Sequence, residues 1–108
     1  MIKQTININS IDIGILRQTI QERLPELRQR YGIKSLGIFG SHVHGRQTKR
    51  SDIDLLVEFD NQMPVTLIGF VALERELGSL LGRRVDLVER EALKPAIGRR
   101  ILAEVVPV

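Results

Sequence analysis

Residues 39–59, FGSHVHGRQTKRSDIDLLVEF, contain the pattern that decides the fold. The apolar residues Leu36–Phe39 lead into this stretch and are typical of a buried strand, and Leu55–Phe59 form a second apolar run. A basic, glycine-containing loop separates the two runs, and Asp52 and Asp54 stand where the second run begins. The stretch therefore predicts two strands joined by a polar loop, with two acids at the start of the second strand.

The two aspartates share one face of the predicted strand. Alternate side chains of a strand point the same way, so the Cα atoms of Asp52 and Asp54 are expected roughly 6–7 Å apart on one face. The opposite face is apolar and points into a core; it consists of Ile53, Leu55, Val57 and Phe59. Two like charges held together repel each other. A divalent cation offsets that repulsion, and Mg²⁺ prefers carboxylate and phosphate oxygens.

The turn formed by Gly40 and Ser41 follows the first strand directly. Glycine lets a phosphate approach the backbone closely, and backbone N–H groups and the serine hydroxyl are able to donate to it. A phosphate-binding turn beside a two-carboxylate metal site indicates nucleotide chemistry. The basic side chains of the loop, Arg46, Lys49 and Arg50, either form a solvated turn or face a triphosphate.

This combination resembles the signature of the DNA polymerase β-like nucleotidyltransferase superfamily. Its short form is similar to the minimal nucleotidyltransferase (MNT) domain, typical of the antitoxins of HEPN/MNT toxin–antitoxin pairs. The resemblance covers about residues 23–103, and one position departs from it, because many family members carry arginine where His44 stands. The motif consists of Gly40-Ser41, a spacing of ten residues to Asp52, Gly45, Ser51 and the apolar strand after Asp54.

The resemblance implies a Mg²⁺-dependent enzyme that transfers AMP from ATP to a tyrosine of a partner HEPN ribonuclease toxin, and so neutralises it. Two Mg²⁺ ions are expected at three catalytic carboxylates. Two of these are Asp52 and Asp54. In the superfamily the third comes from a neighbouring strand, and Asp86 matches that position. The alternative for Asp86 is an ion pair with Arg84 or Arg90. The nucleotide is expected on Gly40, Ser41, Ser51 and Arg50.

Apolar periodicity predicts further elements on both sides of this motif. Residues 11–30 are expected to form a helix capped by Ser10, in which Pro25 either makes a kink or begins a new helix. Further expected elements are a strand over 33–39, a helix over 65–81, a strand over 85–88 and a helix over 91–103. The fold class is therefore α/β, of the α+β kind. We expect a nucleotidyltransferase fold with a small mixed sheet and helices mainly on one face.

Composition sets limits on the kind of protein. The chain has 108 residues, of which 43% are hydrophobic and 27% charged, with a net charge of +3 and no cysteine. This predicts a single domain over 1–108 with a loose segment over 1–9, a cytoplasmic location, no membrane span and no direct DNA binding. The apolar residues 105–108 either return to the sheet or meet a partner.

The acceptor is the harder question. The sequence ends about twenty residues after Asp86, which leaves no room for an acceptor-binding domain, so another protein is expected to bring the acceptor. Two other functions stay open. The chain is either an antitoxin that acts by contact alone, or a small-molecule nucleotidyltransferase that works as a dimer. A neighbouring gene for a short helical protein with an R-x4-6-H motif would favour the toxin pair.

Overall fold

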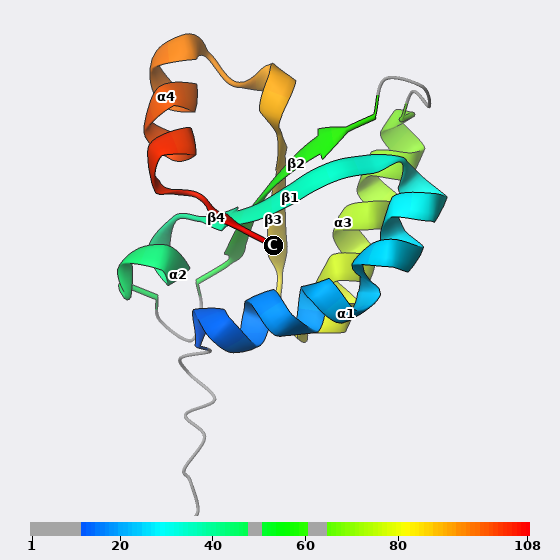
Figure 1. Cartoon of the computed structure of the whole chain (residues 1–108), viewed down its shortest axis with the longest axis horizontal. Coiled ribbons are helices and arrows are strands. Elements are labelled where there is room, and N and C mark those ends of the chain that lie inside the picture. Colours follow the sequence, from blue (N-terminus) through cyan, green and yellow to red (C-terminus); the bar gives the residue numbers. More distant parts are fainter. Residues whose placement is uncertain (1–11, 48–50, 61–64) are drawn as a thin grey trace, which may run out of the picture.

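The computed structural model describes residues 12–47, 51–60 and 65–108. Its strands form one mixed sheet in the order β3-β2-β1-β4 (Figure 1). Strand β1 runs antiparallel to β2 and to β4, whereas β2 and β3 are parallel. The mixed sheet expected from the sequence is therefore confirmed. The strands are β1 (Ile33–Phe39), β2 (Ile53–Phe59), β3 (Val85–Glu89) and β4 (Val106–Pro107).

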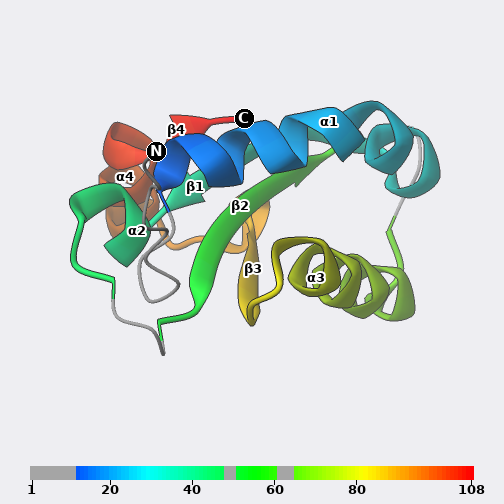
Figure 2. The same cartoon turned by 90° about the horizontal axis from the view of Figure 1, so that it is seen from below.

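Two long helices cover one face of the sheet. They are α1 (Ile13–Tyr31) and α3 (Leu67–Leu81), and their buried leucines join the core. The shorter elements are the one-turn helix α2 (Ser41–His44), the 3-10 turn η1 (Arg90–Ala92) and the helix α4 (Pro95–Glu104). Figures 1 and 2 show α4 and α3 on opposite sides of the strands, which agrees with helices packed mainly on one face.

Helix α1 is one continuous helix. Its carboxylate cap is Asp12, whose Oδ1 accepts from the Gly14 N–H at 2.6 Å, while the expected cap Ser10 lies outside the described residues. Pro25 lies inside this helix, so it does not begin a new one. The helix ends at Gly32 with φ 69°, a left-handed conformation that favours glycine. Its buried stripe is Leu16, Ile20, Leu24 and Leu27.

Strand β2 is the centre of the core. The alternation predicted for it is confirmed, because the residues on its core face are fully or almost fully buried: Ile53, Leu55, Val57 and Phe59. Two residues of α3, Leu73 and Leu77, are 0% exposed and pack against this face. Strand β3 alternates in the same way, with Val85 and Leu87 buried. Hydrophobic burial therefore holds these strands in register.

The end of the chain returns to the sheet. Residues of β4 pair with Gly37 and Ile38 of β1, and the Val108 N–H donates to the Leu36 carbonyl at 2.9 Å. Gly37 makes this possible, since a Cβ on it would lie 2.4 Å from Cγ2 of Val105. Of the two alternatives for residues 105–108, the structure shows the return to the sheet.

The region before β4 differs from the single helix expected over 91–103. It divides into η1 and α4, and Pro95 occupies the first turn of α4, where its missing N–H costs nothing. None of the helices in the described part of the chain is long and apolar enough to cross a membrane.

A pair of leucines on α3 tests this account of the core. Leu77 is 0% exposed and Leu67 is 79% exposed. Replacing either leucine by alanine makes the same change of residue type on the same helix, so the two variants differ mainly in the burial of the lost side chain. We expect Leu77→Ala to lower the free energy of unfolding by about 2–5 kcal/mol and Leu67→Ala to change it by less than about 0.5 kcal/mol. Urea unfolding of the two variants measures both values. Equal losses would show that the packing of α3 is assigned wrongly.

Candidate active site

The three predicted carboxylates meet where the parallel strands begin. Asp54 of β2 and Asp86 of β3 are direct partners in the register, and adjacent strands lie about 4.8 Å apart. Asp52 directly precedes β2. Asp52 and Asp54 are half-buried, whereas Asp86 is exposed on the outer strand. The structure thus brings together the acids that the sequence places 34 positions apart at most.

The charges of this cluster act on one another. Burial, and then the negative charges of Asp86 and Asp52, raise the pKa of Asp54 to about 6. A hydrogen bond from the backbone N–H of Ser41 works in the opposite direction, because it stabilises the ionised carboxylate. A carboxyl group with such a pKa exchanges its proton near neutral pH, which is typical of functional sites.

The glycine turn is packed directly against Asp54. Strand pairing places Phe39 opposite Asp54, so the turn that follows Phe39 reaches the carboxylate. Gly40 has φ 81°, and a Cβ on it would lie 2.1 Å from Oδ2 of Asp54. The N–H of Ser41 donates to Asp54, although the sequence suggested a phosphate as its acceptor. The contact of the Ser41 hydroxyl with a phosphate stays a prediction.

The loop after Ser41 differs from expectation, because its first residues form helix α2. His42 and His44, which fall within the stretch expected to be a loop, lie on this helix. His42 is 3% exposed, and neither ring nitrogen has a hydrogen-bond partner among the described residues. Burial, reinforced by the charge of Arg83, lowers the pKa of His42. His44 pairs with Glu104, with 3.1 Å between Nε2 and Oε2. Sequence reasoning missed the burial of His42 and the pairing of His44, because Arg83 and Glu104 lie far from these histidines in the chain.

The remaining predicted residues are placed only in part. Ser51 is half-buried and directly precedes Asp52. Arg50 lies outside the described residues, so its predicted contact with the nucleotide stays a prediction. Arg90, one alternative partner for Asp86, instead donates to Glu58 at 3.1 Å.

The donor chemistry of the cluster fits a divalent cation, although the side chains do not form a closed cage. Carboxylate oxygens are the ligands that Mg²⁺ prefers. Burial, and then the charges of Asp86 and Asp52, raise the pKa of Asp54, and a cation would offset that repulsion. As the side chains stand, no three His, Asp or Glu residues of the described ranges are grouped so as to hold a metal ion. Asp52, Asp54 and Asp86 thus remain a predicted metal site.

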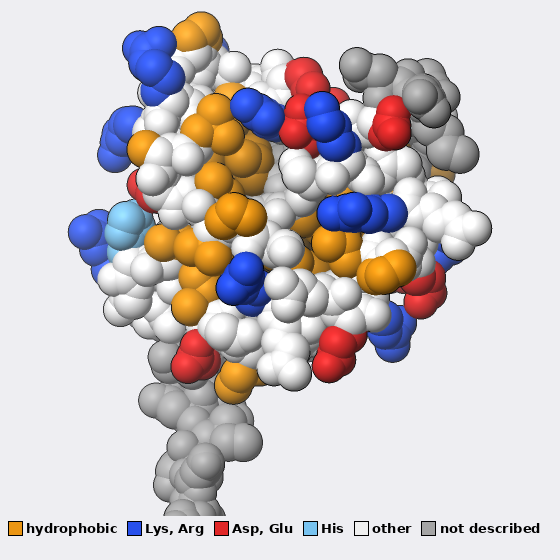
Figure 3. Space-filling model, in the orientation of Figure 1, with side chains coloured by type: hydrophobic (Ala, Val, Ile, Leu, Met, Phe, Trp, Pro, Cys, Tyr) orange, Lys and Arg blue, Asp and Glu red, His pale blue; other side chains and the backbone are white. Residues whose placement is uncertain are grey.

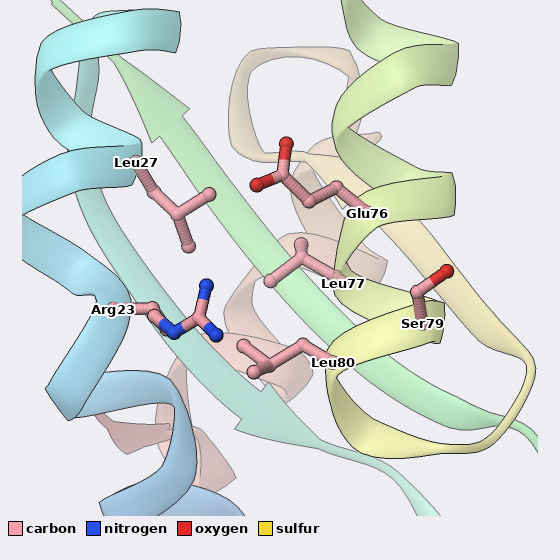
Figure 4. A pocket seen from close by; sticks show the side chains of 6 residues that line it. All are labelled: Arg23, Leu27, Glu76, Leu77, Ser79 and Leu80. Atoms are coloured by element: carbon pink, nitrogen blue, oxygen red, sulfur yellow. The ribbon is translucent and has the colours of Figure 1, made fainter.

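A separate hollow of about 220 Å³ lies between α1 and α3 (Figure 4). Arg23, Leu27, Glu76 and Leu77 are among its lining residues. Glu76 is engaged in the fold, since it accepts from the Tyr31 hydroxyl at 2.7 Å. The hollow belongs to the helix-covered face, whereas alternation turns Asp54 and Asp86 to the other face. We therefore do not assign the nucleotide to it.

A mixed sheet with acids at the start of two parallel strands, and a glycine turn packed on one of them, defines the nucleotidyltransferase class of fold. Residues 20–108 match the nucleotidyltransferase domain family. The chain belongs to this family and is an enzyme of the nucleotidyltransferase class. It is 47% identical over 81 residues to the protein adenylyltransferase MntA of Thermococcus cleftensis, which is 75% of this chain and 80% of the relative. A relative from Methanocaldococcus jannaschii is 38% identical over 95 residues, 87% of this chain and 95% of its own length.

Solved structures share the fold. A minimal nucleotidyltransferase superposes with a TM-score of 0.76 at 35% identity, over 91% of this chain and 97% of the other. A second match is a chain in the complex of a tri-AMPylated Shewanella oneidensis HEPN toxin with an MNT antitoxin. It superposes with a TM-score of 0.62 at 19% identity, over 85% of this chain and 70% of that chain. The nucleotidyltransferase fold and the resemblance to the MNT family are thereby confirmed.

The raised pKa of Asp54 makes a prediction about stability. Its folded value of about 6 exceeds the ordinary value of 3.8, so the folded state holds a proton that the unfolded chain has already lost between these pH values. The contribution to stability is fully present below pH 3.8 and is lost as pH rises through about 6. Asp86→Asn removes one repelling charge, so we expect it to lower the pKa of Asp54 and to weaken this loss. Carbon-detected NMR titration of the metal-free protein, with urea unfolding at several pH values, checks both. An unchanged Asp54 titration in the variant would contradict the assigned contact.

The two turn glycines form a matched pair for a second test. Gly40 and Gly45 both have positive φ, but a Cβ on Gly45 meets nothing within 4 Å. Alanine at either position costs about 1–3 kcal/mol of backbone strain. Only Gly40→Ala also displaces Asp54, so we expect it to weaken binding of a nucleoside triphosphate about tenfold or more, since small displacements at a site have large effects. Calorimetric titration of both variants measures the difference, and equal affinities would mean that Gly40 matters for folding alone.

Proposed function

We propose that this chain is a Mg²⁺-dependent antitoxin that transfers AMP from ATP to a tyrosine hydroxyl of a partner HEPN ribonuclease toxin and thereby neutralises it. The observation that carries the proposal is the set of contacts around Asp54. Asp86 stands beside it on β3, and the turn of Gly40 and Ser41 is packed against its other side. A transferase needs this combination of a phosphate-binding turn and adjoining carboxylates.

The names of similar proteins support the acceptor. The relative from Thermococcus cleftensis is named a protein adenylyltransferase, and its identity of 47% makes a shared reaction the simplest expectation. An antitoxin of the same fold was solved with a tri-AMPylated HEPN toxin, and another toxin–antitoxin structure contains AMP-PNP. A protein acceptor and an adenine nucleotide are therefore the substrates we propose.

The reaction forms one phosphorus–oxygen bond, breaks another and moves one proton. The tyrosine oxygen attacks the α-phosphorus of ATP, the bond from that phosphorus to the bridging oxygen breaks, and pyrophosphate leaves. Asp86, the exposed acid, accepts the hydroxyl proton. The hydroxyl of Ser41, with Gly40, Ser51 and Arg50, holds the phosphates.

The metal ions of the proposal would be held by Asp52, Asp54 and Asp86. When bound, Mg²⁺ neutralises phosphate charge and makes the acceptor hydroxyl more acidic. The protein's own contribution is to bury Asp54 beside two other acids, which raises its pKa to about 6, while the Ser41 N–H stabilises its ionised form.

A partner protein also fits the surface of the molecule. Large apolar side chains stand exposed on three helices of the described chain, and most of them are on α3 and α4. On α1 the residue is Ile15, on α3 they are Leu67, Ile68 and Val71, and on α4 Ile97 and Leu102. Exposed apolar side chains that gather on one element are typical of protein–protein contacts. This supports an acceptor that is carried by another chain.

Intact mass spectrometry tests the transfer. The protein is incubated with the HEPN-type product of its neighbouring gene, ATP and Mg²⁺. We expect the partner to gain one or more AMP groups, and an Asp52→Ala, Asp54→Ala double variant to add none, because the carboxylates act as a unit. Asp86→Asn is expected to slow the transfer about 10²–10⁴-fold, the usual contribution of a proton acceptor. Peptide mapping, with the modified tyrosine replaced by phenylalanine, identifies the acceptor.

Other outcomes separate the alternatives. A stable complex without any gain in mass would favour an antitoxin that acts by contact alone. Transfer of AMP to a small hydroxyl compound by the isolated protein, with none to the partner, would favour a small-molecule nucleotidyltransferase. Either result would remove the proposed acceptor while leaving the nucleotidyltransferase class of the chain intact.

A further inference from the structure

The short helix α2 is tied to the far end of the chain. The imidazole of His44 and the carboxylate of Glu104 approach to 3.1 Å between Nε2 and Oε2. These side chains are 39% and 29% exposed, so the pair is only partly screened by water. His44 is the last residue of α2 and Glu104 is the last residue of α4, so one contact joins the C-terminal ends of two helices.

Helix α2 depends on contacts with the rest of the fold, of which the buried His42 is one and the pair with Glu104 another. It has four residues, and a helix of one turn has too few internal hydrogen bonds to be stable by itself. Its own bonds run to the Gly40 carbonyl from the N–H of Val43 at 3.1 Å and of His44 at 3.4 Å. Gly40 and Ser41, at its start, are the residues that contact Asp54. The orientation of α2 therefore sets the position of the turn at the candidate active site.

Glu104 is a firm anchor, because the residues after it are fixed on the sheet. Val105 packs on Gly37, and β4 pairs with β1. The side chain of Arg17 on α1 donates from Nε to the Pro107 carbonyl at 2.9 Å. Figure 3 shows hydrophobic side chains gathered on the side of the molecule where α4 and β4 lie. The anchor is thus connected to α1, β1 and the sheet edge.

We propose that the His44–Glu104 pair positions α2, and through it the turn of Gly40 and Ser41, for binding of the nucleotide. His44 and Glu104 are positioning residues in this account and do not touch the reacting atoms. The inference rests on the proposed function for its activity readout, whereas its structural readout is independent of any reaction. It also gives His44 a role that arginine would keep, because arginine is a cation that pairs well with a carboxylate.

A double-mutant cycle tests the coupling. His44→Ala and Glu104→Ala are compared with the double variant, with His44→Arg as the rescue and Glu22→Ala, which removes an exposed acid on α1, as the control. We expect each single variant to raise the KM for ATP about 2–5-fold, the effect of losing one partly exposed polar pair. We expect kcat to stay within about twofold, the double variant to be no worse than either single variant, and His44→Arg to restore KM.

Hydrogen exchange supplies the readout that needs no activity. The amides of Val43, His44 and Arg46 donate within the segment 40–46, so their protection reports the order of α2. We expect faster exchange in His44→Ala and Glu104→Ala, and wild-type exchange in Glu22→Ala. Unchanged exchange in the two alanine variants would overturn the inference.

Kinetic results have equally direct consequences. A higher KM in His44→Ala with none in Glu104→Ala would mean that His44 contacts the nucleotide directly, and the positioning role would be wrong. If the wild-type protein transfers no AMP, ATP affinity measured by calorimetry replaces KM. Loosened α2 with weakened ATP binding would then support the inference while the proposed transfer fails, and absence of ATP binding by the wild-type protein would overturn both.

Discussion

The parallel register between β2 and β3 is the constraint on which the candidate active site depends. It places Asp54 beside Asp86, and like charges at that spacing oppose the pairing. Burial of the alternate residues supplies the opposing free energy, since Ile53 and Leu55 are 0% exposed on the other face of the same strand. The period of two that buries these residues also forces Asp54 to the opposite face. Core and site are therefore consequences of one alternation.

Strand β1 contributes the second half of the site through its end. Because β1 is antiparallel to β2, its last residue lies beside the first residues of β2, and the turn that follows reaches Asp54. Only a residue without a side chain fits there, and the turn both desolvates the carboxylate and donates the Ser41 N–H to it. The raised pKa of Asp54 on β2 thus reflects burial, to which the turn after β1 contributes, together with the charge of Asp86 on β3.

Local patterns predicted the elements well, and long-range contacts explain what they missed. The alternation of β2, the strand over 33–39 and the helix that the sequence predicts over 65–81 depend on neighbouring residues, so the sequence was sufficient for them. The partner of His44 is Glu104, 60 positions further along the chain, and no local sequence pattern predicts this contact. The acids were found because their spacing forms a motif, but the packing of Gly40 on Asp54 required the pairing of β1 with β2.

The order of the parts across the sheet also bears on the proposed transfer. The turn of Gly40 and Ser41 follows β1, Asp54 stands on β2, and Asp86 stands exposed on β3, the outer strand of the described sheet. In-line displacement needs a leaving group, a reacting phosphorus and an attacking hydroxyl in a row. If pyrophosphate lies at the turn, the hydroxyl must enter from the β3 side, where Asp86 is open to solvent. The returning C-terminal residues pair with β1, so they lie on the other side of β2 from β3. A partner protein could therefore reach Asp86, the carboxylate that we propose accepts the proton of the acceptor hydroxyl.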